Sequence, residues 1–187
     1  NNDKIDYSFD IKDDRVTIRE RRRGSPIDKV VSELMIYVNT EWGKQLTEAG
    51  ITGIFRSQAN GKVKMSTSPA PHQGLGVSQY TWSSSPMRRY VDLINQRQLI
   101  ALLRKEAPPY QKDSHSLLVA MRDFDAAYNI YGEFQRSMER YWCLRWLLQE
   151  NIQITNAQVI KENLVKLDHM PLITRVPSLP DMAPGTY

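Results

Sequence analysis

Cysteine is almost absent from this sequence of 187 residues, with Cys143 its single example. One thiol excludes a disulfide framework within the chain and a zinc site built from several cysteines. A chain without disulfides is typical of a reducing compartment, so we expect a cytoplasmic location. Long apolar runs are also missing. The longest, such as residues 117–121, are far shorter than the roughly 20 residues that a membrane span needs.

The signatures of several enzyme classes are absent as well. The three histidines, His72, His115 and His169, are scattered, with no second histidine or acid at the spacing of metal ligands. No glycine-rich phosphate loop, nucleophile elbow or Cys–His pair is visible. The tightest acidic cluster centres on Asp13 and Asp14, where a hairpin needs turn residues, and a turn explains it better than a metal site.

The composition is that of an ordinary folded protein, with 41% hydrophobic and 25% charged residues. The length indicates one domain, or one domain and part of another. A formal net charge of +4 is compatible with a polyanionic partner without establishing one. The chain opens on Asn1 rather than on methionine and closes in a turn at residues 184–187, so we expect a piece of a longer protein.

Hydrophobic periodicity predicts the first elements. Alternation over residues 6–22 predicts a β-hairpin. Ser25 and Pro26 form a typical helix start, and apolar residues at helical spacing extend this helix to about Glu48, with Gly50 as its C-cap. Residues 51–56 predict a short strand, and the prolines and glycines of residues 57–79 predict a long loop.

Two further helices follow in the prediction. One begins at the Ser85–Pro86 step and ends at residues 107–109, and the other runs from about Ser116 to Gln149. Aromatic residues recur on the longer helix at helical spacing, and we interpret them as core residues: Tyr128, Tyr131, Phe134, Trp142 and Trp146. Strand-like alternation returns at residues 152–154 and 163–167, so the fold class is α+β, with a candidate boundary near residue 150.

The segment from Tyr80 to Arg97 carries the strongest chemical signal. The predicted helix start places Arg88 and Arg89 in a first helical turn, where the helix dipole disfavours cations. Two guanidiniums there make sense if a phosphate binds at the helix N-terminus. Asp92, four residues after Arg88, would lie on the same face and hold its guanidinium. The alternative is a surface helix whose arginines are neutralised locally, and the residues alone leave both interpretations open.

The same segment resembles the signature of the RNB-domain exoribonucleases, the ribonuclease II and ribonuclease R family. That pattern is approximately an aromatic residue, a short spacer and Ser-Pro-x-Arg-Arg/Lys-Tyr-x-Asp-x-x-x-x-Arg. The residues that fit it are Ser85, Pro86, Arg88, Arg89, Tyr90, Asp92 and Arg97. Further likenesses follow the family's order at residues 30–39, 53–56, 72–76 and 137–140, so the resemblance covers about residues 7–150.

The resemblance implies a domain plan. Residues 1–150 would be the C-terminal part of an RNB catalytic domain, with a mixed or antiparallel sheet flanked by helices and one long C-terminal helix. Residues 151–187 would be a linker and the beginning of a truncated S1-like domain, a β-rich barrel of the OB type.

The resemblance also implies a reaction. Members of this family hydrolyse single-stranded RNA processively from its 3′ end to nucleoside 5′-monophosphates, by attack of a metal-bound water on the phosphodiester. Magnesium is the usual ion, and the family's metal-binding aspartates lie upstream of the region that matches here. We therefore expect Mg²⁺ in the full-length enzyme, no metal ligand within this chain, and no nuclease activity from this chain alone.

The resemblance also implies a role for each residue that occupies a position of the family's motifs. Arg88 takes the place of the catalytic arginine, which contacts the scissile phosphate. Glu33 takes the place of a glutamate that holds the terminal nucleotide, through the ribose hydroxyl that distinguishes RNA. Further RNA contacts are implied for Arg89, Arg97, Glu139 and Tyr80. Supporting roles are implied for Ser85, Tyr90 and Asp92.

Two alternatives stay open at this stage. The chain could come from a non-catalytic RNA-binding relative that kept the scaffold and lost the aspartates. It could also be a helical interaction module that uses the helix of residues 116–149. Salt-dependent binding of RNA would separate the first two interpretations from the helical module.

Overall fold

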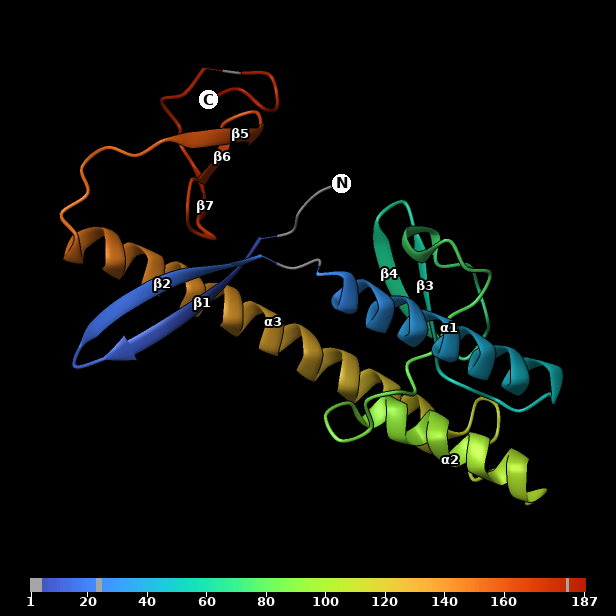
Figure 1. Cartoon of the computed structure of the whole chain (residues 1–187). Coiled ribbons are helices and arrows are strands. Elements are labelled where there is room, and N and C mark those ends of the chain that lie inside the picture. Colours follow the sequence, from blue (N-terminus) through green and yellow to red (C-terminus); the bar gives the residue numbers. More distant parts are fainter. Residues whose placement is uncertain (1–4, 23–24, 181) are drawn as a thin grey trace. The chain divides into compact units, whose positions relative to one another are not determined.

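The computed structural model describes residues 5–22, 25–180 and 182–187. In chain order the elements are β1 (Ile5–Lys12), β2 (Arg15–Arg22), α1 (Pro26–Glu48), β3 (Phe55–Ala59), β4 (Lys62–Ser66), the 3-10 turn η1 (Gln73–Leu75), α2 (Tyr90–Arg104), α3 (His115–Gln149), β5 (Ala157–Lys161), β6 (Leu164–Leu167) and β7 (Ile173–Arg175). The strands form three small antiparallel sheets, β1-β2, β3-β4 and β5-β6-β7. The α+β class predicted from the sequence is confirmed (Figure 1).

The chain divides into two compact units. One comprises residues 26–130, with α1, the β3-β4 hairpin, α2 and the first part of α3. The other comprises residues 1–25 and 131–187, with the β1-β2 hairpin, the rest of α3 and the sheet β5-β6-β7. The domain boundary that the resemblance implies near residue 150 stays a prediction.

Three predicted elements are confirmed with nearly their predicted bounds. The first hairpin pairs Ile5 with Arg22 and Lys12 with Arg15, so Asp13 and Asp14 form its turn, both at positive φ. Helix α1 ends where expected, because the amide of Gly50 donates to the carbonyl of Thr47 at 3.1 Å. Helix α3 covers 35 residues, about 52 Å at 1.5 Å per residue.

The loop predicted for residues 57–79 is partly wrong. Strands β3 and β4 pair from Phe55–Ser66 to Ala59–Lys62, which leaves a two-residue turn of Asn60 and Gly61. Both turn residues have positive φ, 50° and 75°, as a type I′ hairpin turn requires. An Asn-Gly pair is the strongest short-range sequence signal for such a hairpin. Asn60 and Gly61 therefore indicate a hairpin here, which the prediction of a long loop did not include.

The strand predicted for residues 51–56 begins later, at Phe55. The preceding backbone pairs with side-chain amides of α2 in place of a neighbouring strand. Asn95 Oδ1 accepts from the Ile54 amide at 2.7 Å, and Asn95 Nδ2 donates to the Ile54 carbonyl at 2.9 Å. Gln98 Nε2 donates to the Thr52 carbonyl at 2.7 Å. These side chains satisfy the backbone groups that a sheet would otherwise pair.

Two further predictions are wrong in detail. Residues 152–154 are not a strand, and β5 begins only at Ala157. The aromatic stripe of α3 is not uniformly core, since Tyr128, Tyr131 and Phe134 are 48%, 76% and 63% exposed. Periodicity identifies an apolar helix face, but it does not show whether a neighbouring element covers that face.

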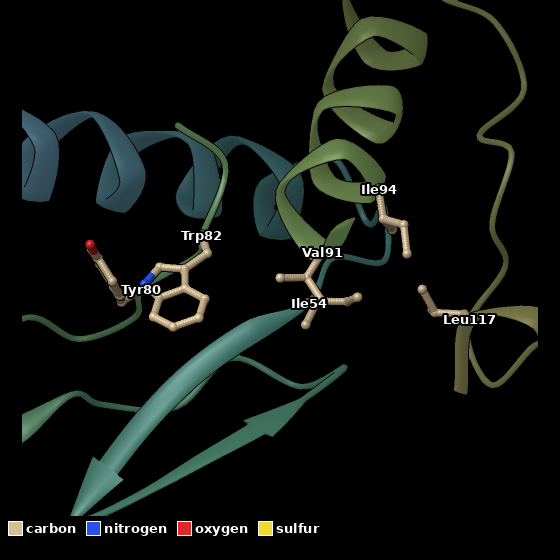
Figure 2. Packing of buried hydrophobic residues seen from close by; sticks show 6 residues of the cluster. All are labelled: Ile54, Tyr80, Trp82, Val91, Ile94 and Leu117. Carbon is tan, nitrogen blue, oxygen red and sulfur yellow. The ribbon is translucent and has the colours of Figure 1, made fainter. Parts of the chain in front are cut away.

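The core of the unit of residues 26–130 forms where α2, the first turn of α3, the backbone just before β3 and the segment before α2 meet. Its buried side chains are Ile54, Tyr80, Trp82, Val91, Ile94 and Leu117. Figure 2 shows Ile54 and Val91 lying together at the start of α2, with Trp82 and Tyr80 on the neighbouring segment. This core therefore anchors the segment that carries the arginine-rich motif.

The other unit has its own core around Cys143 and the strands after α3, including Val159, Val165 and Met170. Strand β6 alternates between half-buried and buried residues, as a strand with one face on a core does. No helix among the described residues is both long and apolar enough to cross a membrane.

Asn95 gives a direct test of this architecture. Its fully buried amide holds the Ile54 amide and carbonyl and the Trp82 carbonyl, the last at 2.9 Å. We expect Asn95→Leu to lower the free energy of unfolding by about 3–5 kcal/mol, because buried backbone groups lose their partners. Urea unfolding followed by tryptophan fluorescence measures this, with exposed Arg104→Ala as the control, expected within about 0.5 kcal/mol of wild type. A loss of under about 1 kcal/mol would contradict the role assigned to Asn95.

Candidate functional site

Helix α2 begins at Tyr90, four residues later than Pro86, at which the sequence analysis started it. Residues 86–88 form a turn, in which the amides of Arg88 and Arg89 both donate to the Ser85 carbonyl, at 3.2 and 3.1 Å. Arg89 is the N-cap residue, with extended φ and ψ of −134° and 113°. The two arginines therefore precede the helix, and the argument that placed them in its first turn is wrong.

Asp92 binds Arg89 and not Arg88. Arg89 donates to both carboxylate oxygens, from Nε to Oδ2 and from Nη2 to Oδ1, each at 2.8 Å. The Ser85 amide donates to Asp92 Oδ1 at 2.7 Å. The Asp92 side chain is fully buried and that of Arg89 is 14% exposed. The predicted Arg88–Asp92 pair is therefore replaced by a bidentate, buried Arg89–Asp92 pair that closes the turn.

The segment before the turn is fixed from α1. The buried Asn39 side chain accepts from the Ser83 amide at 2.9 Å and donates to Ser84 Oγ at 3.0 Å. Thr81 Oγ1 donates to the Asn39 carbonyl at 2.7 Å. The segment lies so close to α1 that a Cβ on Gly43 would be 3.0 Å from the Thr81 methyl carbon. These contacts determine where the following turn sits.

Arg88 itself is exposed. Its guanidinium has no hydrogen bond or ion pair with any residue that the structure describes. The backbone that carries it is held by Ser85, Asp92 and Asn39, as described above. An uncompensated, forked cation on a fixed turn can receive an anion such as a phosphate without disturbing an existing contact.

Trp82 joins two arginines. The guanidinium carbon of Arg56 lies 3.9 Å from the centroid of the Trp82 ring, and that of Arg89 lies 4.2 Å from it. Phe124 and Tyr128 of α3 meet the same indole edge-on, at centroid distances of 6.4 and 5.7 Å. Burial lowers the pKa of Arg56, with the charge of Arg89 contributing in the same direction.

His72 and Tyr80 lie beside this cluster. Both are 8% exposed, and their rings meet edge-on at 5.7 Å. His72 Nδ1 is buried and has no hydrogen-bond partner. Burial lowers the pKa of His72 and the charge of Arg56 lowers it further, while burial raises the pKa of Tyr80. The predicted RNA contact of Tyr80 therefore concerns a ring that the rest of this unit largely covers.

Arg97 lies on an exposed part of α2 with two tyrosines. Its Nη1 donates to the Tyr110 hydroxyl at 3.2 Å. A hydrogen bond with Tyr110 raises the pKa of Tyr90, which is 48% exposed. A cation with phenolic side chains around it has the composition of a surface that binds a nucleic-acid strand.

The two glutamates singled out in the sequence lie in different compact units. Glu33 is exposed on α1, in the unit that also contains Arg88. Glu139 lies on α3 in the other unit, half-buried, and accepts from Gln135 Nε2 at 2.9 Å. Burial raises the pKa of the nearby Cys143 thiol to about 11, with the charge of Glu139 adding to the effect.

Sequence reasoning gave no role to several residues that build this site. Arg56, Asn39, Trp82 and Asn95 appeared in the sequence analysis only as parts of matched segments. The available signal was a row of polar residues in α2 at every third position: Asp92, Asn95 and Gln98, all fully buried. From sequence alone such a row is indistinguishable from a solvent-exposed face.

Comparison with known proteins identifies the sequence family of this segment. The RNB domain profile matches residues 61–105, which include the turn and most of α2. Exoribonuclease 2 of Erwinia tasmaniensis is 41% identical over 59 residues, 32% of this chain and 9% of the relative. The same enzyme from Serratia proteamaculans is 36% identical over 69 residues, 37% of this chain and 10% of the relative. The chain thus spans about a tenth or less of these curated relatives.

Solved structures share the fold over nearly the whole chain. An active-site mutant of the Dss1 exoribonuclease from Candida glabrata superposes with a TM-score of 0.76 at 21% identity, covering 95% of this chain and 28% of Dss1. Mycoplasma genitalium RNase R in complex with double-stranded RNA superposes with a TM-score of 0.72 at 14% identity. That match covers 94% of this chain and 42% of the RNase R chain. Residues 61–105 are therefore RNB-domain sequence, and the chain is related to the RNase II and RNase R exoribonucleases.

Proposed function

We propose that this chain supplies the arginine-and-glutamate side of the active site of a 3′–5′ exoribonuclease. In the full-length enzyme, single-stranded RNA would be hydrolysed processively to nucleoside 5′-monophosphates. One observation carries the proposal: Arg88 is an exposed cation without a partner among the described residues, on a turn fixed by buried hydrogen bonds. That turn lies within the segment that matches the RNB domain.

Arg88 would stabilise charge that develops on the scissile phosphate. A fixed donor needs little reorganisation during the reaction, and this is the main source of electrostatic catalysis. The turn meets this condition, because the Ser85 amide is held by Asp92 and the Ser83 amide by Asn39. The side chain of Arg88 can then contact the phosphate while its backbone stays in place.

The other residues divide into contacts and supports. Glu33, on the exposed surface of α1, would contact the terminal ribose, and Arg97 would contact a phosphate. Contacts of Glu139 and Tyr80 with RNA stay part of the proposal. For Arg89 the bidentate pair with Asp92 favours a supporting role, shared with Ser85, Asp92 and Tyr90.

Magnesium and an S1-like domain also belong to the proposal. Within the described residues no group of three or more His, Cys, Asp or Glu side chains is placed to hold a metal ion. The proposal therefore places the magnesium ligands upstream of this chain, as the resemblance implies, and assigns no metal-dependent step to these residues. Residues 151–187, with the sheet β5-β6-β7, would be the linker and the first strands of the S1-like barrel.

Binding of RNA is the first test. We expect the chain to bind single-stranded RNA with an affinity that falls steeply as salt rises, because phosphate contacts release counterions. Arg97→Ala should weaken binding and lower the salt slope by about 0.7, the value for one phosphate of a single strand. Fluorescence anisotropy with a labelled oligouridylate at several salt concentrations measures both quantities. An affinity independent of salt would count against the proposal and favour a helical interaction module.

Arg88 is tested by separating rate from affinity in the full-length enzyme. We expect Arg88→Ala to lower the single-turnover rate by about 10²–10³, by analogy with the loss of an oxyanion-hole donor. Affinity for RNA should barely change, because many other contacts hold the strand. Arg88→Lys should recover only part of the rate, since an ammonium lacks the forked geometry. A normal rate in Arg88→Ala would remove Arg88 from the active site.

The supporting role of Arg89 is tested through stability. We expect Arg89→Leu and Asp92→Leu each to lower the free energy of unfolding by about 3–5 kcal/mol, because each leaves a buried charge unpaired. The double substitution should cost at least about 2 kcal/mol less than the sum of the single losses. Chemical denaturation of the four proteins of this cycle gives the coupling energy. Additive losses would show that the pair does not hold the turn.

A further inference from the structure

Two arginines contact one indole, and only one of them is neutralised. Arg56 and Arg89 lie 3.9 and 4.2 Å from the Trp82 ring centroid. Arg89 forms its bidentate pair with the buried carboxylate of Asp92. Arg56 has no ion pair with any carboxylate of the described residues, although it is half-buried. Both arginines therefore contact Trp82, but only Arg89 has a carboxylate partner.

The surroundings of Arg56 hold it in place without using its donors. Its backbone amide donates to the Tyr80 carbonyl at 2.7 Å, which ties β3 to the segment that contains Trp82. Side-chain Nε is completely covered and has no hydrogen-bond partner. The terminal nitrogens also lack a hydrogen bond within the described residues, but they are not among the covered atoms, so they reach the surface.

A second unpartnered nitrogen lies nearby. His72 is 92% buried, since 8% of it is exposed, and its Nδ1 has no partner. The positive charge of Arg56 acts on this ring, and that of Arg89 acts on Arg56. The region around Trp82 therefore contains the positive charge of Arg56 with no carboxylate to balance it, because the carboxylate of Asp92 is already bound by Arg89. Burying an unpaired cation costs folding free energy, and a bound anion would offset that cost.

We propose that Arg56 binds a backbone phosphate of the RNA strand, with Trp82 holding its guanidinium in place. The inference rests on the proposed function and assigns it a residue to which the signature motif gives no role. A guanidinium suits a phosphate because two of its N–H groups can bind two phosphate oxygens. Tyr128, 48% exposed and 5.7 Å from the Trp82 ring, offers an aromatic face for the adjoining base or ribose.

The test compares charge-matched variants of the complete chain. Arg56→Gln and Arg56→Lys are set against Arg104→Gln, which removes the same charge from an exposed arginine in the last turn of α2. Binding of a fluorescein-labelled oligouridylate of about 12 nucleotides is followed by anisotropy at several salt concentrations. Thermal unfolding of each variant is recorded in parallel. Affinities are measured at a temperature well below the lowest melting temperature of the set.

We expect Arg56→Gln to weaken RNA binding about tenfold, the effect of losing a charge-assisted hydrogen bond. Its salt slope should fall by about 0.7, the value for one single-strand phosphate. Arg56→Lys should keep the slope and recover only part of the affinity. Arg104→Gln should change affinity by about twofold or less, because an exposed distant charge is screened. The melting temperature of Arg56→Gln should change little, because loss of the contact with Trp82 is offset by removal of a half-buried charge that has no anionic partner.

Each other outcome overturns the inference in a distinguishable way. If wild type binds RNA and Arg56→Gln behaves like Arg104→Gln, the role of Arg56 is wrong and the proposed function stands. If Arg56→Gln loses stability and Arg56→Lys restores stability and affinity together, Arg56 serves only to pack against Trp82. If Arg56→Gln loses binding of an oligoglutamate and keeps binding of RNA, the partner is an acidic protein. If wild type does not bind RNA at all, the proposed function fails as well.

Discussion

A row of buried polar side chains on α2 is the feature on which the unit of residues 26–130 depends. Asp92, Asn95 and Gln98 follow one another at every third position and are fully buried. Together they bind the backbone of three irregular segments. Asp92 and Asn95 bind the segment before α2, at Ser85 and Trp82; Asn95 and Gln98 bind the segment before β3, at Ile54 and Thr52; and Gln98 also binds Tyr110, after α2. These segments have few strand partners, so the side chains of one helix satisfy the backbone groups that would otherwise be buried without partners.

This arrangement explains why a site can form on irregular backbone. Loops carry binding groups well only when a rigid scaffold fixes them. Here Asp92 and Asn95 hold the segment from α2, and Asn39 holds it from α1, so the turn that carries Arg88 is fixed from two helices. The side chain of Arg88 remains outside this network. The buried hydrogen bonds thus determine the position of Arg88, although its guanidinium takes part in none of them.

The same network shows where prediction from sequence stops. The hairpin at residues 5–22, helix α1 and the length of α3 follow from periodicity and capping, which are local properties. The start of α2 was misplaced because Ser85–Pro86 is a good helix start in isolation, whereas here the Ser85 amide is bound by Asp92. Exposure of Tyr131 and burial of Asn95 depend on which other elements pack there. The motif could therefore be found from sequence, but the partner of Asp92 could not.

Arginine chemistry at Trp82 illustrates the same point in electrostatic terms. Arg56 and Arg89 contact one ring at nearly equal distances, so residue type and aromatic contact do not separate them. The two arginines are distinguished by the position of a single carboxylate, because Asp92 neutralises Arg89 and leaves the charge of Arg56 uncompensated. A buried ion pair contributes structure, whereas an unpaired guanidinium held in place provides a site for an anion. Counting basic residues gives the net charge of a surface, and only the ion-pair partners show which cations remain available to a ligand.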